Sequence, residues 1–124
     1  MKQASNSRST MYDLESRCFK FTLAVRDYIK PLPKSLTNKE FCRQLIRSAG
    51  SVGANYIEAN EALSKKDFLF RVKIAKKDAK ETRYWLLLTE PEEDGLRGQK
   101  YLVQEATEIM KMLGAVIEKS KHPI

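Results

Sequence analysis

Glycine and proline are scarce in this chain, with 5 glycines and 4 prolines among 124 residues. Folds built from many short strands need Gly/Pro-rich turns, so the scarcity disfavours a loop-rich all-β protein. Hydrophobic residues make up 42% and charged residues 31%, which excludes a disordered chain of low hydrophobicity. The length suits a single domain, and the composition indicates a small, soluble, helical protein.

Histidine and cysteine are nearly absent: the chain has one histidine, His122, and two cysteines, Cys18 and Cys42. Most nucleophilic and zinc chemistries need clustered His or Cys. We therefore predict no catalytic residues, no metal and no cofactor. In a helical hairpin Cys18 would lie about 12 Å along the axis from the level of Cys42, beyond the roughly 7 Å between Cα atoms that a disulfide spans. Both cysteines are expected to be free and buried.

Long apolar runs are also missing, since the longest covers only residues 84–88. A membrane-spanning helix needs roughly 20 apolar residues, so no membrane partner is expected. Residues 1–10 are polar and lack the apolar region of a secretory signal. They are predicted to form a disordered tail on a cytoplasmic protein.

The apolar residues that are present recur at spacings of three and four, which indicates amphipathic helices. Four such series predict helices at residues 11–30, 38–63, 65–89 and 96–120. The second series ends at Leu63 and the fourth at Val116. Long helices with short links favour an all-α, antiparallel up-down four-helix bundle, with the domain covering residues 11–121.

Three Ser/Thr residues have the spacing of helix N-caps, with an acid three residues later. These pairs are Thr10 with Asp13, Thr37 with Glu40, and Ser64 with Asp67.

The second predicted helix carries Gly50 and Gly53 in its middle. Each costs about 1 kcal/mol relative to alanine. Close packing against a neighbouring helix explains this cost best. A kink or a ligand-facing surface stays open as an alternative.

The formal net charge of +7 is concentrated in residues 64–89, where eight Lys+Arg stand against three Asp+Glu, a net +5. On a helical projection Lys66, Lys73, Lys77 and Lys80 lie within about 60° of one another, opposite the apolar series. The remaining members lie inside or beside this stripe: Lys65, Lys76, Arg83 and Tyr84. We name these eight residues the basic ridge.

Such a ridge suits contact with a nucleic-acid phosphate backbone, either RNA or DNA. Contact made by lysines would be salt-sensitive and not sequence-specific. The alternative is a solvated helix face that only keeps the protein soluble.

A second apolar face on the third helix holds Phe70, Ile74, Trp85 and Leu88. Large apolar patches seldom remain exposed, so these four are candidate oligomer-interface residues, and a homo-oligomer is expected. An acidic link, residues 90–94 with four acids, follows the third helix.

Several stretches carry a family resemblance: residues 12–15 (YDLE), 51–59 (SVGANYIEA), 64–68 (SKKDF) and 80–86 (KETRYWL). Over residues 12–121 the chain closely resembles the bacterial four-helix-bundle family encoded in intervening sequences of 23S ribosomal RNA genes. The resemblance implies antiparallel bundles that assemble as rings, typically homopentamers. A related branch is the accessory variability determinant of diversity-generating retroelements, a basic ring that binds nucleic acid and a reverse transcriptase.

Ridge and resemblance together predict a non-enzymatic, oligomeric nucleic-acid-binding accessory protein that assists a reverse transcriptase in some relatives. The alternative is an oligomeric scaffold that binds a protein partner through the acidic link or the apolar faces. An enzyme is disfavoured, because the acid pair Glu58 and Glu61 is a spacing common on any helix and does not make a metal site.

Overall fold

The computed structural model describes the backbone of residues 2–121 and the side chains of residues 13–121. Its elements are α1 (Lys2–Ile29), α2 (Leu36–Asn60), α3 (Lys65–Leu88), a short 3-10 helix η1 (Glu93–Gly95) and α4 (Leu96–Lys121). The described residues contain no strand, so the predicted all-α class with four helices is confirmed. None of the described helices carries an apolar stretch long enough to cross a bilayer.

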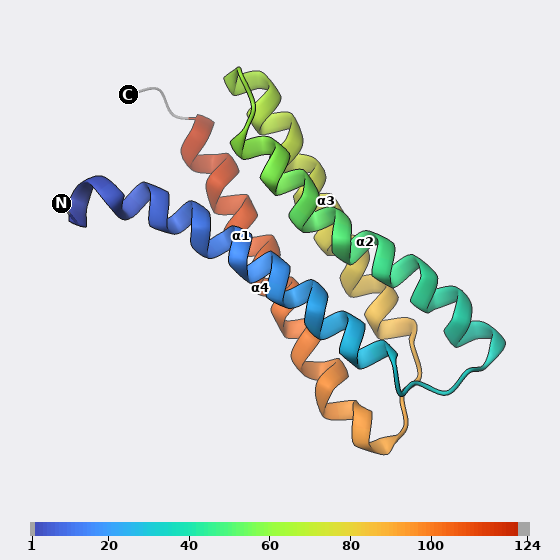
Figure 1. Ribbon diagram of the computed structural model, residues 1–124. Coiled ribbons are helices and arrows are strands. Elements are labelled where there is room, and N and C mark those ends of the chain that lie inside the picture. Colours follow the sequence, from blue (N-terminus) through green and yellow to red (C-terminus); the bar gives the residue numbers. More distant parts are fainter. Residues whose placement is uncertain (1, 122–124) are drawn as a thin grey trace.

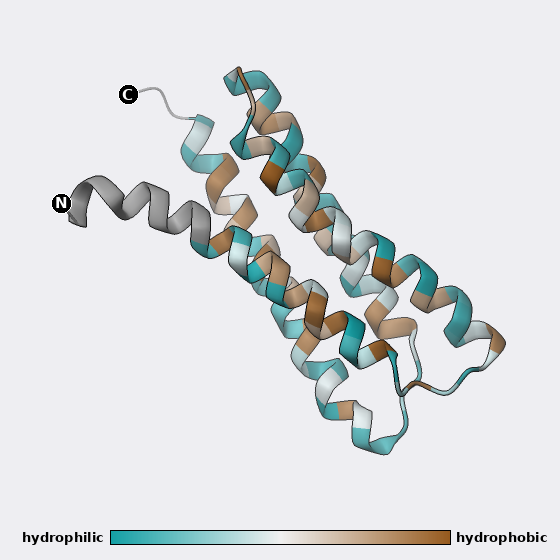
Figure 2. Cartoon of the chain, in the orientation of Figure 1, coloured by the Kyte–Doolittle hydropathy of each residue, from teal (hydrophilic) through white to brown (hydrophobic). Residues whose placement is uncertain are grey.

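The four helices lie side by side around one core (Figure 1). The α1–α2 and α3–α4 links lie together at one end, and the α2–α3 link lies at the other end with the start of α1 and the end of α4. Hydrophobic residues recur along each helix between hydrophilic ones (Figure 2). This is the pattern by which amphipathic helices bury one face each.

The first predicted apolar series is buried throughout, from Leu14 on α1 to Leu32 just beyond the end of that helix. Two other series end differently from the prediction. Leu63 is 100% exposed, because α2 stops at Asn60 and Ser64 takes the extended backbone of the N-cap of α3. On α4 the last buried position is Ile117, and Val116 is only half-buried.

Two of the predicted caps fall within the described side chains. Ser64 caps α3 as expected, its hydroxyl accepting the Asp67 amide at 3.1 Å. The predicted cap at Thr37 is wrong. Ser35 caps α2 instead and accepts the Asn38 amide at 3.1 Å, because Ser35 already has the extended backbone of an N-cap.

The start of α1 at Lys2 precedes the predicted start at residue 11. The side chains of residues 1–12, including the predicted cap Thr10, lie outside the described part of the structure. The division between a disordered tail and the domain therefore stays a prediction. His122 also lies outside the described residues.

The glycines of α2 have different surroundings. A Cβ at Gly53 would lie 3.3 Å from the Cβ of Cys18, so α1 approaches α2 closely there, as predicted. A Cβ at Gly50 would meet nothing within 4 Å, so close packing does not explain that glycine. Near this crossing the Thr22 hydroxyl donates to the Ala49 carbonyl at 3.1 Å. Both cysteines are free, but only Cys18 is buried as predicted, because Cys42 is half-buried.

Candidate nucleic-acid interface

The basic ridge is positioned by the buried face of α3. Val72, Ala75 and Ala79 are completely buried, and the helix periodicity then turns the intervening lysines outward. Lys73, Lys76, Lys77 and Lys80 are all exposed. The predicted outward orientation of these four lysines is therefore present in the structure.

These four lysines line one side of a groove of about 430 Å³ between α3 and α4. The α4 side supplies Met110, Gly114, Ile117, Glu118 and Lys121. We name the five cationic residues the lysine groove: Lys73, Lys76, Lys77, Lys80 and Lys121.

The charge in the groove is predominantly positive. The one carboxylate among its lining residues, that of Glu118, lies 3.2 Å from the ammonium of Lys121. The four α3 lysines form no ion pair with any of the described side chains. Their charges are thus available to an anion that enters the groove.

Gly114 keeps the groove open on its α4 side. A Cβ at this position would lie 3.5 Å from the Nζ of Lys76 and 3.7 Å from its Cε. The ammonium of Lys76 therefore reaches across to the backbone of α4. The contribution of α4 to this site was not predicted, because periodicity gives the faces of one helix but does not say which helix lies beside each face.

The other predicted ridge residues lie outside the groove. Lys65 lines a separate shallow hollow with Leu63 and Phe68 at the start of α3, and Lys66 is exposed beside it. Arg83 is half-buried and donates to the Thr107 hydroxyl of α4 at 3.1 Å, so it joins two helices. Tyr84 is 58% exposed.

The four interface candidates are not equally exposed. Phe70 is 60% exposed, whereas Ile74, Trp85 and Leu88 are half-buried. The Trp85 ring lies 6.1 Å from the ring of Phe41 on α2, and its Nε1 donates to Glu81 at 3.1 Å. Trp85 therefore already packs within the chain, and Phe70 is the most accessible of the four.

A polar cluster joins α2 to α3 beside this face. Asn55 donates to the Asp78 carboxylate at 3.2 Å and accepts from Arg71 at 3.0 Å. Burial is the main cause that raises the pKa of Asp78, with the like charge of Glu81 adding to it. The cluster is explained by helix packing and needs no ligand.

Within the described residues, no group of three or more His, Cys, Asp or Glu side chains is arranged to hold a metal ion. What the geometry presents is a cationic groove whose α4 side includes the apolar residues Met110 and Ile117. Such a surface can bind a polyanion without bond-making chemistry.

The sequence profile of the 23S rRNA-intervening sequence protein family matches residues 12–115. The chain belongs to this family. The match covers α2, α3 and every residue of the lysine groove except Lys121. The predicted family resemblance is thereby confirmed.

A solved structure is also similar: a protein of unknown function from the S23 ribosomal protein family of Bacteroides thetaiotaomicron. It has a TM-score of 0.73 and 28% identity, and the similarity covers 88% of this chain and 98% of that chain. No curated protein matches the chain.

Proposed function

We propose that this protein is a non-enzymatic, cytoplasmic accessory protein that binds RNA or DNA through the lysine groove. The single observation that carries the proposal is the presence of five lysines around one groove in which the one carboxylate among the described lining residues is paired. Lysine ammonium groups are point charges, so they position phosphates but do not read bases. The expected binding is independent of sequence and weakens steeply with salt.

The proposal includes assembly of an antiparallel up-down bundle into a homo-oligomeric ring, typically a pentamer in the family that the chain resembles. The Phe70 side chain on α3 supports assembly, because it is 60% exposed and a contact with another subunit would remove it from water. A ring would repeat the lysine groove in every subunit and strengthen binding through multivalency. Assistance to a reverse transcriptase belongs to the same proposal.

The decisive experiment compares two triple variants of equal net charge. The first replaces Lys73, Lys77 and Lys80 with glutamate, and the control replaces the exposed Lys20, Lys39 and Lys100. Fluorescence anisotropy with a labelled RNA hairpin and a labelled DNA duplex measures affinity. We expect the groove variant to lose at least about tenfold more affinity than the control. Equal losses would show that only the total charge matters.

Two further measurements test the remaining parts of the proposal. Multi-angle light scattering gives the subunit number, and a monomer at micromolar concentration contradicts the ring. Incubation of the pure protein with RNA and DNA in Mg²⁺ or Mn²⁺ tests for nuclease activity. Intact substrates support the non-enzymatic role.

The second candidate function is a scaffold that binds a protein partner. The acidic residues Glu92, Glu93 and Asp94 favour it, because they form an exposed negative surface separate from the lysine groove. A pull-down with nuclease treatment tests this function. Recovery of the same partner protein by the wild type and by the groove variant supports the scaffold.

A further inference from the structure

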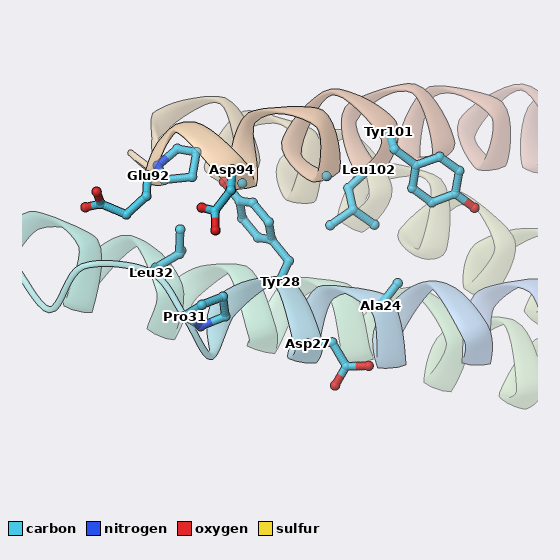
Figure 3. A pocket seen from close by; sticks show the side chains of 12 residues that line it. Ala24, Asp27, Tyr28, Pro31, Leu32, Glu92, Asp94, Tyr101 and Leu102 are labelled. Carbon is cyan, nitrogen blue, oxygen red and sulfur yellow. The ribbon is translucent and has the colours of Figure 1, made fainter.

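A second pocket, of about 390 Å³, lies where α1 ends and α4 begins, at the end of the molecule that carries the α1–α2 and α3–α4 links. We name it the link pocket (Figure 3). The Tyr28 ring and Leu32 from the α1 side and Leu102 from α4 supply apolar wall. Tyr101 stands at its edge, 60% exposed.

Buried hydrogen bonds hold this end of the molecule in place. Asn38 donates to the carbonyls of Pro33 and Glu90, both at 3.0 Å, and accepts the Glu90 amide at 2.9 Å. The Tyr28 hydroxyl lies 2.8 Å from the hydroxyl of Thr89. The two links and the inner wall are therefore fixed before any ligand arrives, which lowers the entropy cost of binding.

The glycine at position 98 shapes the pocket wall. A Cβ there would meet only the Tyr28 ring, at 3.7 Å, an ordinary contact distance. No steric conflict therefore demands a glycine in this turn of α4. Its absent side chain instead leaves room in the pocket.

The charged residues that line the link pocket are all acidic: Asp27, Glu92 and Asp94. Asp27 is already partnered, 3.0 Å from Arg26 and 3.9 Å from Lys30. Within the described residues, no cationic side chain lies at ion-pair distance from Glu92 or Asp94. Figure 3 shows Asp94 extending from the α3–α4 link toward α1, with Glu92 turned outward.

Tyrosine faces beside an unpaired carboxylate favour a cationic side chain, and arginine more than lysine. A guanidinium group stacks on aromatic rings and pairs with carboxylates through two parallel hydrogen bonds. Beyond the pocket the negative surface continues from Glu92 to Glu93. A small amine would leave this surface unused, whereas a basic peptide would cover it.

We propose that the link pocket binds an arginine side chain from a basic segment of a partner protein, with Asp94 as its ion-pair partner and the Tyr28 and Tyr101 rings as its walls. This role is additional to nucleic-acid binding, because it uses the opposite charge and other residues. A protein with both surfaces could hold a nucleic acid and a basic protein at the same time.

The test uses a labelled, terminally blocked peptide with a central arginine between two leucines and a lysine at each end. Fluorescence anisotropy measures its affinity for the full chain, and amide chemical shifts locate the contact. We expect shifts at Gly98 and Leu102 and binding about tenfold weaker for D94N, because a charge-assisted pair is lost. G98L, which fills the pocket, should abolish binding.

The matched control is E58Q, which removes one exposed carboxylate near the far end of α2. It should leave the peptide affinity unchanged, and circular dichroism checks that each variant folds. If G98L fails to fold, D94N still decides. A peptide with citrulline in place of arginine should bind the wild type no more tightly than the arginine peptide binds D94N.

Several results would overturn the proposal: equal weakening by D94N and E58Q, equal binding of the citrulline peptide, or shifts confined to other surfaces. Benzamidine binding without peptide binding would assign the pocket to a small molecule and exclude the peptide. A lower light-scattering mass for D94N or G98L would assign it to contacts between copies. RNA binding by D94N should equal that of the wild type, so failure here leaves the nucleic-acid proposal intact.

Discussion

At the residue scale, much of the specificity of this fold depends on a few buried polar side chains. Asn38 is 2% exposed, and its amide bonds to both links at one end of the molecule. Thr82 is fully buried, and its hydroxyl donates to the Ser48 hydroxyl on α2 at 2.9 Å. Apolar packing tolerates sliding, whereas such hydrogen bonds are satisfied in one arrangement only.

Replacement of Asn38 by alanine should destabilise the protein by about 1–3 kcal/mol, because the change leaves part-buried backbone groups of both links without their partner. Urea unfolding at fixed protein concentration measures this. Thr37→Ala is the matched control one residue away, and its side chain is exposed. It should cost less than about 0.5 kcal/mol. Similar costs for the two variants would contradict the role given to Asn38.

The two cysteines should differ in reactivity. Burial raises the pKa of the Cys18 thiol to about 12, and it raises that of Cys42 as well. The thiolate is the reactive form, so Cys18 stays protonated and protected at neutral and mildly alkaline pH. Because its folded-state pKa lies above the unfolded value, the stability contributed by Cys18 declines once the pH rises above about 9.

Pulsed iodoacetamide labelling followed by peptide mass spectrometry at about pH 8 checks this difference. Cys42 should react first, and Cys18 only after urea is added. Equal labelling rates in the native protein would contradict the burial of Cys18.

At the element scale, the sequence predicted the four helices and most of their buried faces, since an amphipathic period is a property of each helix alone. The ends were less predictable. Thr37 with Glu40 matches the capping-box pattern, whereas Ser35 has Asn38 in place of the acid. Ser35 nevertheless forms the cap, because its backbone is extended. Leu63 fits the periodic series and is still exposed. It lies between the end of α2 at Asn60 and the N-cap of α3 at Ser64, so it belongs to neither helix.

The site was predictable to the same extent. The lysines of α3 follow from its periodicity, so the sequence predicted them. The contributions of Gly114 and Lys121 depend on how α4 lies against α3, and that is a tertiary property with no local signal. The hydrogen bonds between Asn38 and Glu90 were not predicted for the same reason, since the two residues are 52 positions apart in the chain.

The two glycines of α2 give a paired prediction. Gly50→Ala should stabilise the protein by about 0.5–1 kcal/mol, because a Cβ meets no neighbour there and alanine favours the helix. Gly53→Val should destabilise it by about 1–3 kcal/mol, since even a lone Cβ lies 3.3 Å from the Cβ of Cys18. Urea unfolding of both variants at one concentration distinguishes them. Destabilisation by Gly50→Ala would indicate that a partner subunit packs against that position.

At the scale of the whole molecule, charge is separated along the fold. The lysine groove lies between α3 and the C-terminal half of α4, whereas the carboxylates of Glu92, Glu93 and Asp94 lie at the end with the two links. The net charge of +7 therefore describes neither surface well. A partner meets a local field, which is positive at one place and negative at the other.

The salt dependence of nucleic-acid binding should reflect the groove alone. The slope of log affinity against log salt should become shallower by about one unit for each lysine removed from phosphate contact. Single replacements of Lys73, Lys77 or Lys80 by glutamine test this, with Lys100→Gln as the control. A slope that changes equally for all four would contradict a localised interface.

The hydrogen bond from the Glu90 amide to Asn38 has a consequence for the dynamics of the chain. That amide proton lies in an irregular link, where exchange with solvent is ordinarily fast. Here its exchange requires the first turn of α2 to separate from the link between α3 and α4. The rate of deuterium uptake at Glu90 thus reports the opening of a contact between the start of α2 and a link that is far from it in the chain.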